Sequence, residues 1–200
     1  MRIGVLGTGS VGRAISGKLS SLGHDVRVGS RTAGEGKVVF GEAAKFGELV
    51  FNCTSGNGAL AALQSCGDAL DGKVLLDTSN PLDFSKGFPP SLTVCNTDSL
   101  AEVIQRTFPK VRVVKALNTV NHSVMVEPRK LADGEHDLPL CGNDARAKED
   151  VKRLLTSFGW KHFVDLGDLT GARAMEMYLP LWVRLYGGLK TAEFNFKLVK

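Results

Sequence analysis

The sequence predicts an α/β protein: one mostly parallel β-sheet with helices on both faces. Two observations support this. Short, β-branched apolar segments alternate with segments of helical periodicity along nearly the whole chain, which is typical of consecutive βαβ units. A glycine-rich turn, GTGSVG at 7–12, also follows the first apolar segment and precedes the first helical one. Together they favour a doubly wound sheet, in which strands are buried on both sides.

The length and composition of the chain indicate a globular protein with a substantial core. Of the 200 residues, 43% are apolar and 23% are charged, as is usual for soluble domains. We expect residues 1–165 to form the α/β domain and residues 166–200 to form a helical extension. The net charge of +4 is small and scattered, so we expect no nucleic-acid partner.

The chain shows no charged leader before an apolar stretch and no run of about 18 apolar residues. We therefore expect no signal peptide, no membrane partner and a cytoplasmic location. The cysteines share no C-x-x-C spacing and lie in apolar or strand-like surroundings, so buried, reduced thiols are predicted. They are Cys53, Cys66, Cys95 and Cys141. The four histidines share no ligand spacing, and no metal site is expected.

The elements of the first half follow from apolar runs and helical spacing. Strands are predicted at 2–6, 25–30, 48–54 and 73–81, the last of which runs into an Asn-Pro turn. Helices are predicted at 11–22, where Gly23 is the stop signal, at 41–46 and at 58–70. The segment RTAGEGK at 31–37 is predicted to be a loop beside a binding site.

In the second half, capping residues mark the helices. Ser99 and Glu102 form a capping-box pattern, and the helix that they open has four inward positions. These are Leu100, Val103, Ile104 and Phe108. Asp144 is predicted to cap a longer helix that ends at Gly159. Its buried face would be Ala147, Val151, Leu154, Leu155 and Phe158. Strands are predicted at 111–118, 137–142 and 161–167, and helical structure from Leu169 onward, with Pro180 near its middle.

The glycine turn between the first strand and the first helix predicts an anion site. Gly7 allows a tight turn, Gly9 lets the backbone approach a pyrophosphate, and Gly12 lets helix and strand pack closely. The free N–H groups of 8–11, which are Thr8, Gly9, Ser10 and Val11, and the helix N-terminus favour an anion. The alternative is a strand–helix turn that merely needs glycine.

The residues after the second strand predict which dinucleotide would bind. A carboxylate usually stands there and accepts the ribose 2′-hydroxyl, whereas this chain has Ser30 and Arg31. Arg31 could pair with a 2′-phosphate as a planar fork, with about 1.5–3 kcal/mol per charged hydrogen bond. That favours NADP over NAD roughly tenfold to a hundredfold. Thr32, and to a lesser extent Lys37, could add to the pocket; the alternative is an exposed surface arginine.

Polar residues at three further strand ends predict the path toward the nicotinamide. The carboxyl ends of the strands predicted at 48–54, 73–81 and 111–118 carry Thr54 and Ser55, Asn80, and Asn118 with Thr119. Ligands of such sheets lie across these ends. Asn80 and Asn118 are candidates for orienting the nicotinamide or its ribose, although turns also favour these residue types. His122 is either a proton donor or an ordinary surface histidine. No catalytic side chain is predicted, because the cofactor carries hydride chemistry.

Four segments resemble the NADPH-dependent deazaflavin-coenzyme (F420) reductase family and the oxidoreductase domain of six-transmembrane metalloreductases. They are IGVLGTGSVGRAISGKLSSLGHDVRVGSR, DTSNPL, VVKALNT and CGNDARAKEDVKRLL. The resemblance implies a Rossmann-type domain, NADPH on the glycine turn, Ser30, Arg31 and the Thr54, Asn80 and Asn118 loops, and a flavin-like ring at the nicotinamide. It also implies a homodimer formed through 175–188, with Trp182 and Tyr186 as anchors; alternatively these residues cover their own sheet.

We therefore expect an NADP(H)-dependent oxidoreductase that transfers a hydride between NADPH and a small-molecule acceptor: a deazaflavin, a flavin or a similar ring. One alternative is a non-catalytic NADPH-binding sensor module. Another is a small carbonyl or imine reductase. Those enzymes usually need a large helical second domain, and only 35 residues follow Asp165.

Overall fold

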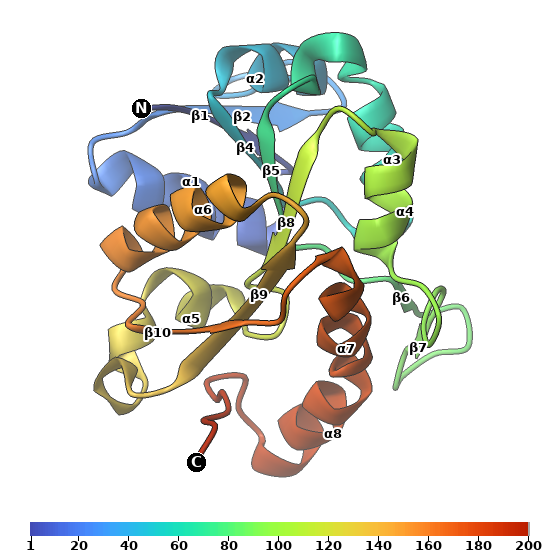
Figure 1. Cartoon of the computed structure of the whole chain (residues 1–200), viewed down its shortest axis with the longest axis vertical. Helices are drawn as coiled ribbons and strands as arrows, with labels where there is room; N and C mark the ends of the chain where they lie inside the picture. The colour runs from blue at the N-terminus through green and yellow to red at the C-terminus, as the bar shows by residue number, and fades with distance from the viewer. Residues whose placement is uncertain (200) are drawn as a thin grey trace.

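The computed structural model describes residues 1–199 and is built around one eight-stranded sheet (Figure 1). The strand order is β10-β9-β8-β5-β4-β1-β2-β3. The strands are β1 (Arg2–Leu6), β2 (Asp25–Ser30), β3 (Val38–Val39), β4 (Leu49–Asn52), β5 (Val74–Asp77), β8 (Arg112–Ala116), β9 (Asp137–Gly142) and β10 (His162–Asp165). All neighbours are parallel except β8 and β9, which are antiparallel. The predicted fold class, a Rossmann-type doubly wound sheet, is confirmed.

Helices cover both faces of this sheet (Figure 1). On one face lie α1 (Ser10–Ser21), α5 (His122–Val126) and α6 (Ala145–Phe158). On the other lie α2 (Phe40–Phe46), α3 (Gly56–Gln64), α4 (Leu100–Thr107) and α7 (Ala172–Met177). The central strands β4 and β5 are buried along their whole length. Two apolar clusters, one on each face, therefore hold the sheet between helical layers.

The longest helix, α6, begins and ends where its capping residues predict. The Asp144 carboxylate accepts a hydrogen bond from the Ala147 backbone N–H at 2.8 Å, and Gly159 ends the helix with a φ of 110°. Its buried face consists of the five predicted residues. Helix α1 likewise ends before Gly23, which adopts a φ of 78°. In both helices the stop signal is a residue in the left-handed region that glycine favours.

Two predicted features differ from the structure, and several elements were not predicted. The helix predicted at 58–70 ends at Gln64, and a separate 3₁₀ turn (Gly67–Leu70) follows because Gly67 has a φ of 54°. The C-terminal helix is divided at Tyr178 into α7 and α8 (Leu179–Leu189), since Pro180 lies in the first turn of α8. The sequence did not predict β3, α5 or the small hairpin of β6 (Leu82–Asp83) and β7 (Ser91–Leu92).

The C-terminal segment folds back on the molecule after α8. The Asp137 backbone N–H donates to the Phe196 carbonyl at 3.1 Å, and Phe194 stacks on Trp182. The second part of the expected division reaches Lys200, which lies outside the described residues. No helix among residues 1–199 has the length and apolar character needed to cross a bilayer.

The cysteines are free, and their burial corrects one prediction. Cys53, Cys66 and Cys141 are buried, as predicted, but Cys95 is exposed. Cys95 lies in the loop between β7 and α4 rather than in a strand. Within the described part of the chain, no three His, Cys, Asp or Glu side chains gather closely enough to hold a metal ion.

Candidate functional site

A cleft of about 650 Å³ opens at the carboxyl ends of the strands, where the strand order reverses between β1 and β4. Five elements form it: the β1–α1 turn, the end of β2, the start of α2, the end of β4 and one side of α3. The lining residues are Gly7, Thr8, Gly9, Ser30, Arg31, Val39, Phe40, Gly41, Cys53, Thr54, Ser55, Gly58, Ala61, Ala62 and Ser65. Seven predicted site residues thus meet in one cleft although up to 48 positions separate them.

The backbone geometry restricts two of the three positions of the first turn to glycine, but not the third. Gly7 has a φ of 121°, and a Cβ there would lie 2.5 Å from the Cys53 carbonyl oxygen. A Cβ on Gly12 would lie 2.0 Å from the Gly7 carbonyl oxygen, so α1 and β1 pack too closely for a side chain. A Cβ on Gly9 would meet nothing within 4 Å. Gly7 and Gly12 therefore serve the fold, whereas Gly9 leaves open space on the cleft wall.

The N-terminus of α1 is available to an anion. Its N-cap is Gly9, no side chain caps it, and the first turn carries no acidic residue. The unpaired N–H groups and the helix dipole together favour a negative charge at this end. Thr8 and Ser10 are exposed beside it.

Arg31 presents an uncompensated positive charge on the wall of the cleft. Its side chain is exposed and makes no ion pair or hydrogen bond to any residue of the described chain. The Ser30 side chain is buried, and its hydroxyl donates to the Thr32 carbonyl oxygen. Thr32 is exposed but does not line the cleft, and Lys37 turns back toward Gly34 in a tight turn.

The loop after β4 is fixed by Asn52, which the sequence analysis did not single out. The Asn52 side-chain oxygen accepts from the Thr54 hydroxyl at 2.7 Å and from the Thr54 backbone N–H at 3.3 Å. Ser55 is the N-cap position of α3. Both Thr54 and Ser55 line the cleft, beside the small residues that α3 turns toward it.

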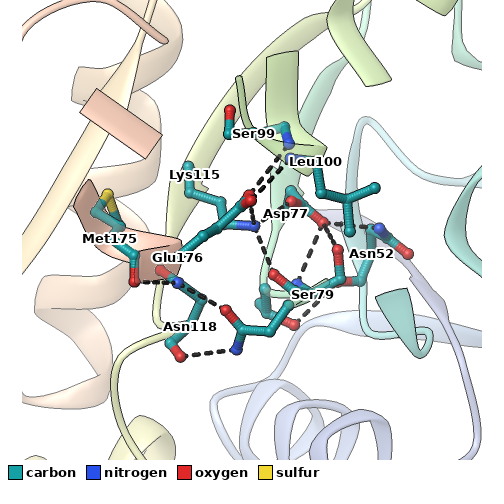
Figure 2. A network of polar contacts seen from close by, with 12 residues as sticks. Asn52, Asp77, Ser79, Ser99, Leu100, Lys115, Asn118, Met175 and Glu176 are labelled. Carbon is teal, nitrogen blue, oxygen red and sulfur yellow. Dashed lines mark hydrogen bonds and ion pairs between the residues drawn. The ribbon is translucent and has the colours of Figure 1, made fainter. Parts of the chain in front are cut away.

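Asn80 and Asn118 lie outside the cleft lining but bind each other (Figure 2). The Asn118 side-chain N–H₂ donates to the Asn80 side-chain oxygen at 2.9 Å and to the Met175 carbonyl at 3.1 Å. The Asn80 N–H₂ donates to the Asn118 backbone oxygen at 2.9 Å. The side-chain oxygens of Asn118 and Thr119 are buried without a partner in the described residues.

Ser10, Val11, Gly12 and His122 complete the predicted set, and none of them lines the cleft. Ser10 and Val11 begin α1, and Gly12 is buried in its first turn. His122 is the first residue of α5 and is partly exposed. Within residues 1–199 its ring makes no hydrogen bond or ion pair.

A buried charge cluster lies behind these loops (Figure 2) and consists of Asp77, Lys115 and Glu176. The Lys115 ammonium lies 2.7 Å from an Asp77 oxygen and 2.8 Å from a Glu176 oxygen, and all three side chains are at most 1% exposed. Burial opposes the charged form of Lys115, but the two carboxylates outweigh it and raise the pKa of this ammonium. The lysine therefore stays charged.

This cluster was not predicted from the sequence, although the sequence contains one signal for it. Lys115 interrupts an apolar strand, VRVVKALN, in a sheet whose strands are expected to be covered on both faces. A charge inside a buried strand requires a partner of opposite sign. The identity of the partners could not be inferred, because Asp77 and Glu176 are 38 and 61 residues away.

The arrangement as a whole fits an anionic dinucleotide. The open side of Gly9 and the uncapped start of α1 suit a pyrophosphate. The unpaired Arg31 suits a further phosphate. The two partnerless oxygens of Asn118 and Thr119 suit a ligand that donates hydrogen bonds.

Comparisons with known proteins match F420-dependent NADP reductases and also metalloreductases. The family described as NADP oxidoreductase, coenzyme F420-dependent, matches residues 2–81. Metalloreductase STEAP3 of Rattus norvegicus is 31% identical over 194 residues, which cover 90% of this chain and 38% of the relative. The F420-dependent NADP reductase of Methanocaldococcus jannaschii is 29% identical over 145 residues, which cover 72% of this chain and 64% of the relative.

A solved structure matches along its full length. It is a protein of Arthrobacter sp. FB24, provisionally named an F420-dependent NADP-reductase. It is 47% identical, the match covers 100% of both chains, and the TM-score is 0.96. This chain spans 38% of the length of the rat metalloreductase and 64% of the length of the Methanocaldococcus jannaschii reductase.

Proposed function

The chain belongs to the family of coenzyme F420-dependent NADP oxidoreductases, and from that premise we propose that it transfers a hydride between NADPH and a deazaflavin. Family membership identifies the general class, an NADP-dependent oxidoreductase. The choice of phosphorylated dinucleotide rests on one observation above all: the uncompensated guanidinium of Arg31 on the wall of the cleft.

The proposed binding mode assigns each part of the cofactor to residues of the cleft. The pyrophosphate would lie on the backbone of Gly7–Gly12, chiefly at Thr8, Gly9, Ser10 and Val11. The 2′-phosphate would meet Arg31, with Ser30 and Thr32 beside it. Thr54 and Ser55 would flank the central part, and Asn80 and Asn118 would hold the nicotinamide end.

The residues of this chain would act by binding and alignment rather than by covalent chemistry. When bound, the reduced nicotinamide supplies the hydride. The protein would hold that ring against a planar acceptor and exclude water from the space between them. Because Asn118 donates both amide hydrogens inside the protein, its oxygen would serve as the acceptor toward the cofactor. No side chain is proposed as an acid, a base or a nucleophile.

We also propose that residues 166–199 serve as an appendage through which two copies associate. Helix α8 exposes Leu181 and Leu189, each 55% exposed, and Tyr186. Trp182, in contrast, is partly covered by Phe194 of its own chain. Light scattering on the purified protein should give the mass of a dimer, and Leu181→Glu should give a monomer. A native monomer at assay concentrations would contradict this proposal.

An acceptor panel tests the proposed activity. NADPH oxidation would be followed with coenzyme F420, FMN, FAD, ferric chelates and a set of carbonyl compounds, each at the same concentration. Turnover with coenzyme F420 and little with the others supports the proposal. Turnover with carbonyl compounds alone, or tight NADPH binding without turnover, would replace the deazaflavin with another acceptor or with a sensing role.

A further inference from the structure

The buried cluster of Asp77, Lys115 and Glu176 has one more carboxylate than it has ammonium groups. Helix α4 balances the difference: Glu176 accepts from the backbone N–H groups of Leu100 at 2.7 Å and Ala101 at 3.2 Å (Figure 2). These are among the N–H groups that a helix leaves without partners, and they carry its positive dipole end. Every charge of the cluster therefore has a built partner.

The cluster is attached to two of the loops that carry proposed cofactor contacts. The second oxygen of the Asp77 carboxylate accepts from the Asn52 side chain at 2.7 Å and from the Ser79 hydroxyl at 2.7 Å. Asn52 in turn holds Thr54, and Ser79 directly precedes Asn80. The Lys115 ammonium also donates to the Ser79 carbonyl. Lys115 thus holds both loops from behind.

The third loop begins three residues after Lys115. Between them, Leu117 is fully buried and has a φ of 66°, a conformation that is unfavourable for a leucine. Such a residue persists only where its surroundings hold it in place. Lys115 anchors the preceding strand, and the Asn118 bonds to Asn80 and Met175 anchor the following residue.

The cluster also joins helix α7 to the loops. Glu176 and Met175 are consecutive residues of α7; one binds Lys115 and the other accepts from Asn118. The Lys115 ammonium therefore contacts the Asn80 loop directly through the Ser79 carbonyl and α7 through Glu176. It reaches the Thr54 loop indirectly, through the bond between Asp77 and Asn52. Purely apolar packing could fill the same volume, since buried ion pairs often add little stability over apolar residues of similar size.

We propose that Lys115 is a positioning residue for the hydride transfer, which fixes the loops of Thr54, Asn80 and Asn118 relative to one another through Asp77, Ser79 and Glu176. This inference rests on the proposed function, because it assumes that these loops hold the nicotinamide. It assigns no contact between Lys115 and the cofactor.

The test uses the full chain with the triple substitution Lys115→Met, Asp77→Asn and Glu176→Gln. The triple variant removes all three charges together, so no unpaired charge remains buried, and the two amides that replace the carboxylates can still accept hydrogen bonds. Three quantities are measured: the NADPH dissociation constant, the fluorescence anisotropy of the bound reduced nicotinamide, and the single-turnover rate with coenzyme F420.

We expect the dissociation constant within about twofold of native, because Arg31 and the glycine turn are untouched. We expect the rate to fall at least about tenfold and the anisotropy to fall toward that of a freely rotating ring.

Lys148→Met is the matched control. Lys148 is a largely buried lysine that pairs with Asp165 at 2.8 Å and lies outside the cluster. All three quantities should stay native in this variant. A triple variant with native rate and native anisotropy would overturn the proposal. So would one whose rate falls only in proportion to its NADPH affinity, since the cluster would then merely support the fold.

Three further outcomes are distinguished. If the triple variant does not fold, Glu176→Gln alone is measured, which keeps the Lys115–Asp77 pair; a rate about threefold lower or more supports the proposal, and native values overturn it. If native protein binds NADPH but does not react with coenzyme F420, the proposed acceptor is wrong, while the nicotinamide anisotropy still decides the role of Lys115. If native protein does not bind NADPH, both proposals fail.

Discussion

Arg31 stands at the carboxyl end of β2, on the cleft wall, with a charge that no described residue neutralises. A guanidinium in this position has a free planar fork for a phosphate. A surface arginine without a partner keeps its hydration and contributes little to stability. The side chain can therefore be removed without affecting the fold, which makes it suitable for a binding test.

Arg31→Ala should raise the NADPH dissociation constant roughly tenfold to a hundredfold, because a charged hydrogen bond contributes about 1.5–3 kcal/mol. The NADH dissociation constant should hardly change, since NADH lacks the 2′-phosphate. Both constants can be measured by titrating nicotinamide fluorescence. Equal losses for the two dinucleotides would rule out the pocket assignment.

Gly9→Ala and Gly12→Ala should impair different properties, cofactor binding and stability respectively. Gly9 has a φ of −71° and open space around its missing Cβ, so alanine should fold normally but crowd the pyrophosphate and weaken NADPH binding about tenfold or more. Gly12→Ala brings a Cβ to 2.0 Å from a backbone oxygen and should lower the melting temperature by several degrees. Calorimetry and NADPH titration of both variants check this pair; a destabilised Gly9→Ala protein would contradict the assignment.

At the scale of elements, several side chains form hydrogen bonds at the N-terminus of α4. The Ser99 hydroxyl accepts from the Glu102 backbone N–H, as the capping-box pattern predicts. The second half of the pattern differs. The Glu102 carboxylate bonds the Ser99 hydroxyl and Arg173, while the Ser99 backbone N–H donates to Asp98. The capping-box pattern assigns the Ser99 backbone N–H to the Glu102 carboxylate, but in the tertiary structure this carboxylate binds Arg173 instead.

Ser99→Ala should therefore lower the free energy of unfolding by about 1 kcal/mol, up to about 2 kcal/mol, because the Glu102 N–H loses its acceptor in a buried site. Urea denaturation followed by circular dichroism measures the difference. Ser20→Ala, at an exposed position of α1, serves as the control and should change stability by less than about 0.5 kcal/mol. Equal effects of the two substitutions would show that Ser99 is not a significant cap.

At the scale of the whole molecule, buried thiols couple stability to alkaline pH. Burial raises the pKa of Cys53 to about 12, of Cys66 to about 11 and of Cys141 to about 12, from an ordinary 9.0. Above pH 9 the unfolded chain therefore loses protons that the native protein keeps. Stability should be fully present below pH 9 and fall as pH rises toward 12.

The expected slope is up to roughly 1.4 kcal/mol per pH unit for each thiol. Lys73, whose pKa is lowered by burial and by Arg2, opposes the trend. Four other groups reinforce it, because their pKa values are raised in the native protein: Lys110, Lys115, Lys152 and Tyr178. Urea denaturation at pH 8, 9 and 10 checks the direction. When the free energy of unfolding of each protein is referred to its own value at pH 8, the Cys53→Ala variant should lose less of it between pH 8 and pH 10 than the native protein does. A native stability that rises over this interval would contradict the expectation.

Local sequence patterns predict much of the fold and part of the candidate site. Gly7, Gly9 and Gly12 predict a strand, a tight turn and a helix within a few residues of one another, and Asp144 and Gly159 predict both ends of α6. These signals depend on backbone conformation and on bonds between near neighbours. The meeting of Arg31 with the glycine turn could also be predicted, because parallel strands bring their carboxyl ends to one edge.

Tertiary structure alone decided the rest. The apolar pattern of β9 predicts a strand but not its antiparallel direction, because that direction depends on how the chain between β8 and β9, which contains α5 and two 3₁₀ turns (Pro128–Lys130 and Ala132–Gly134), returns to the sheet. Likewise, Lys115 requires an anionic partner, yet Asp77 and Glu176 become its neighbours only after the crossovers have placed β5, β8 and α7 together. Periodicity and capping are properties of adjacent residues, whereas the partners of a buried charge depend on which distant elements the completed sheet brings into contact.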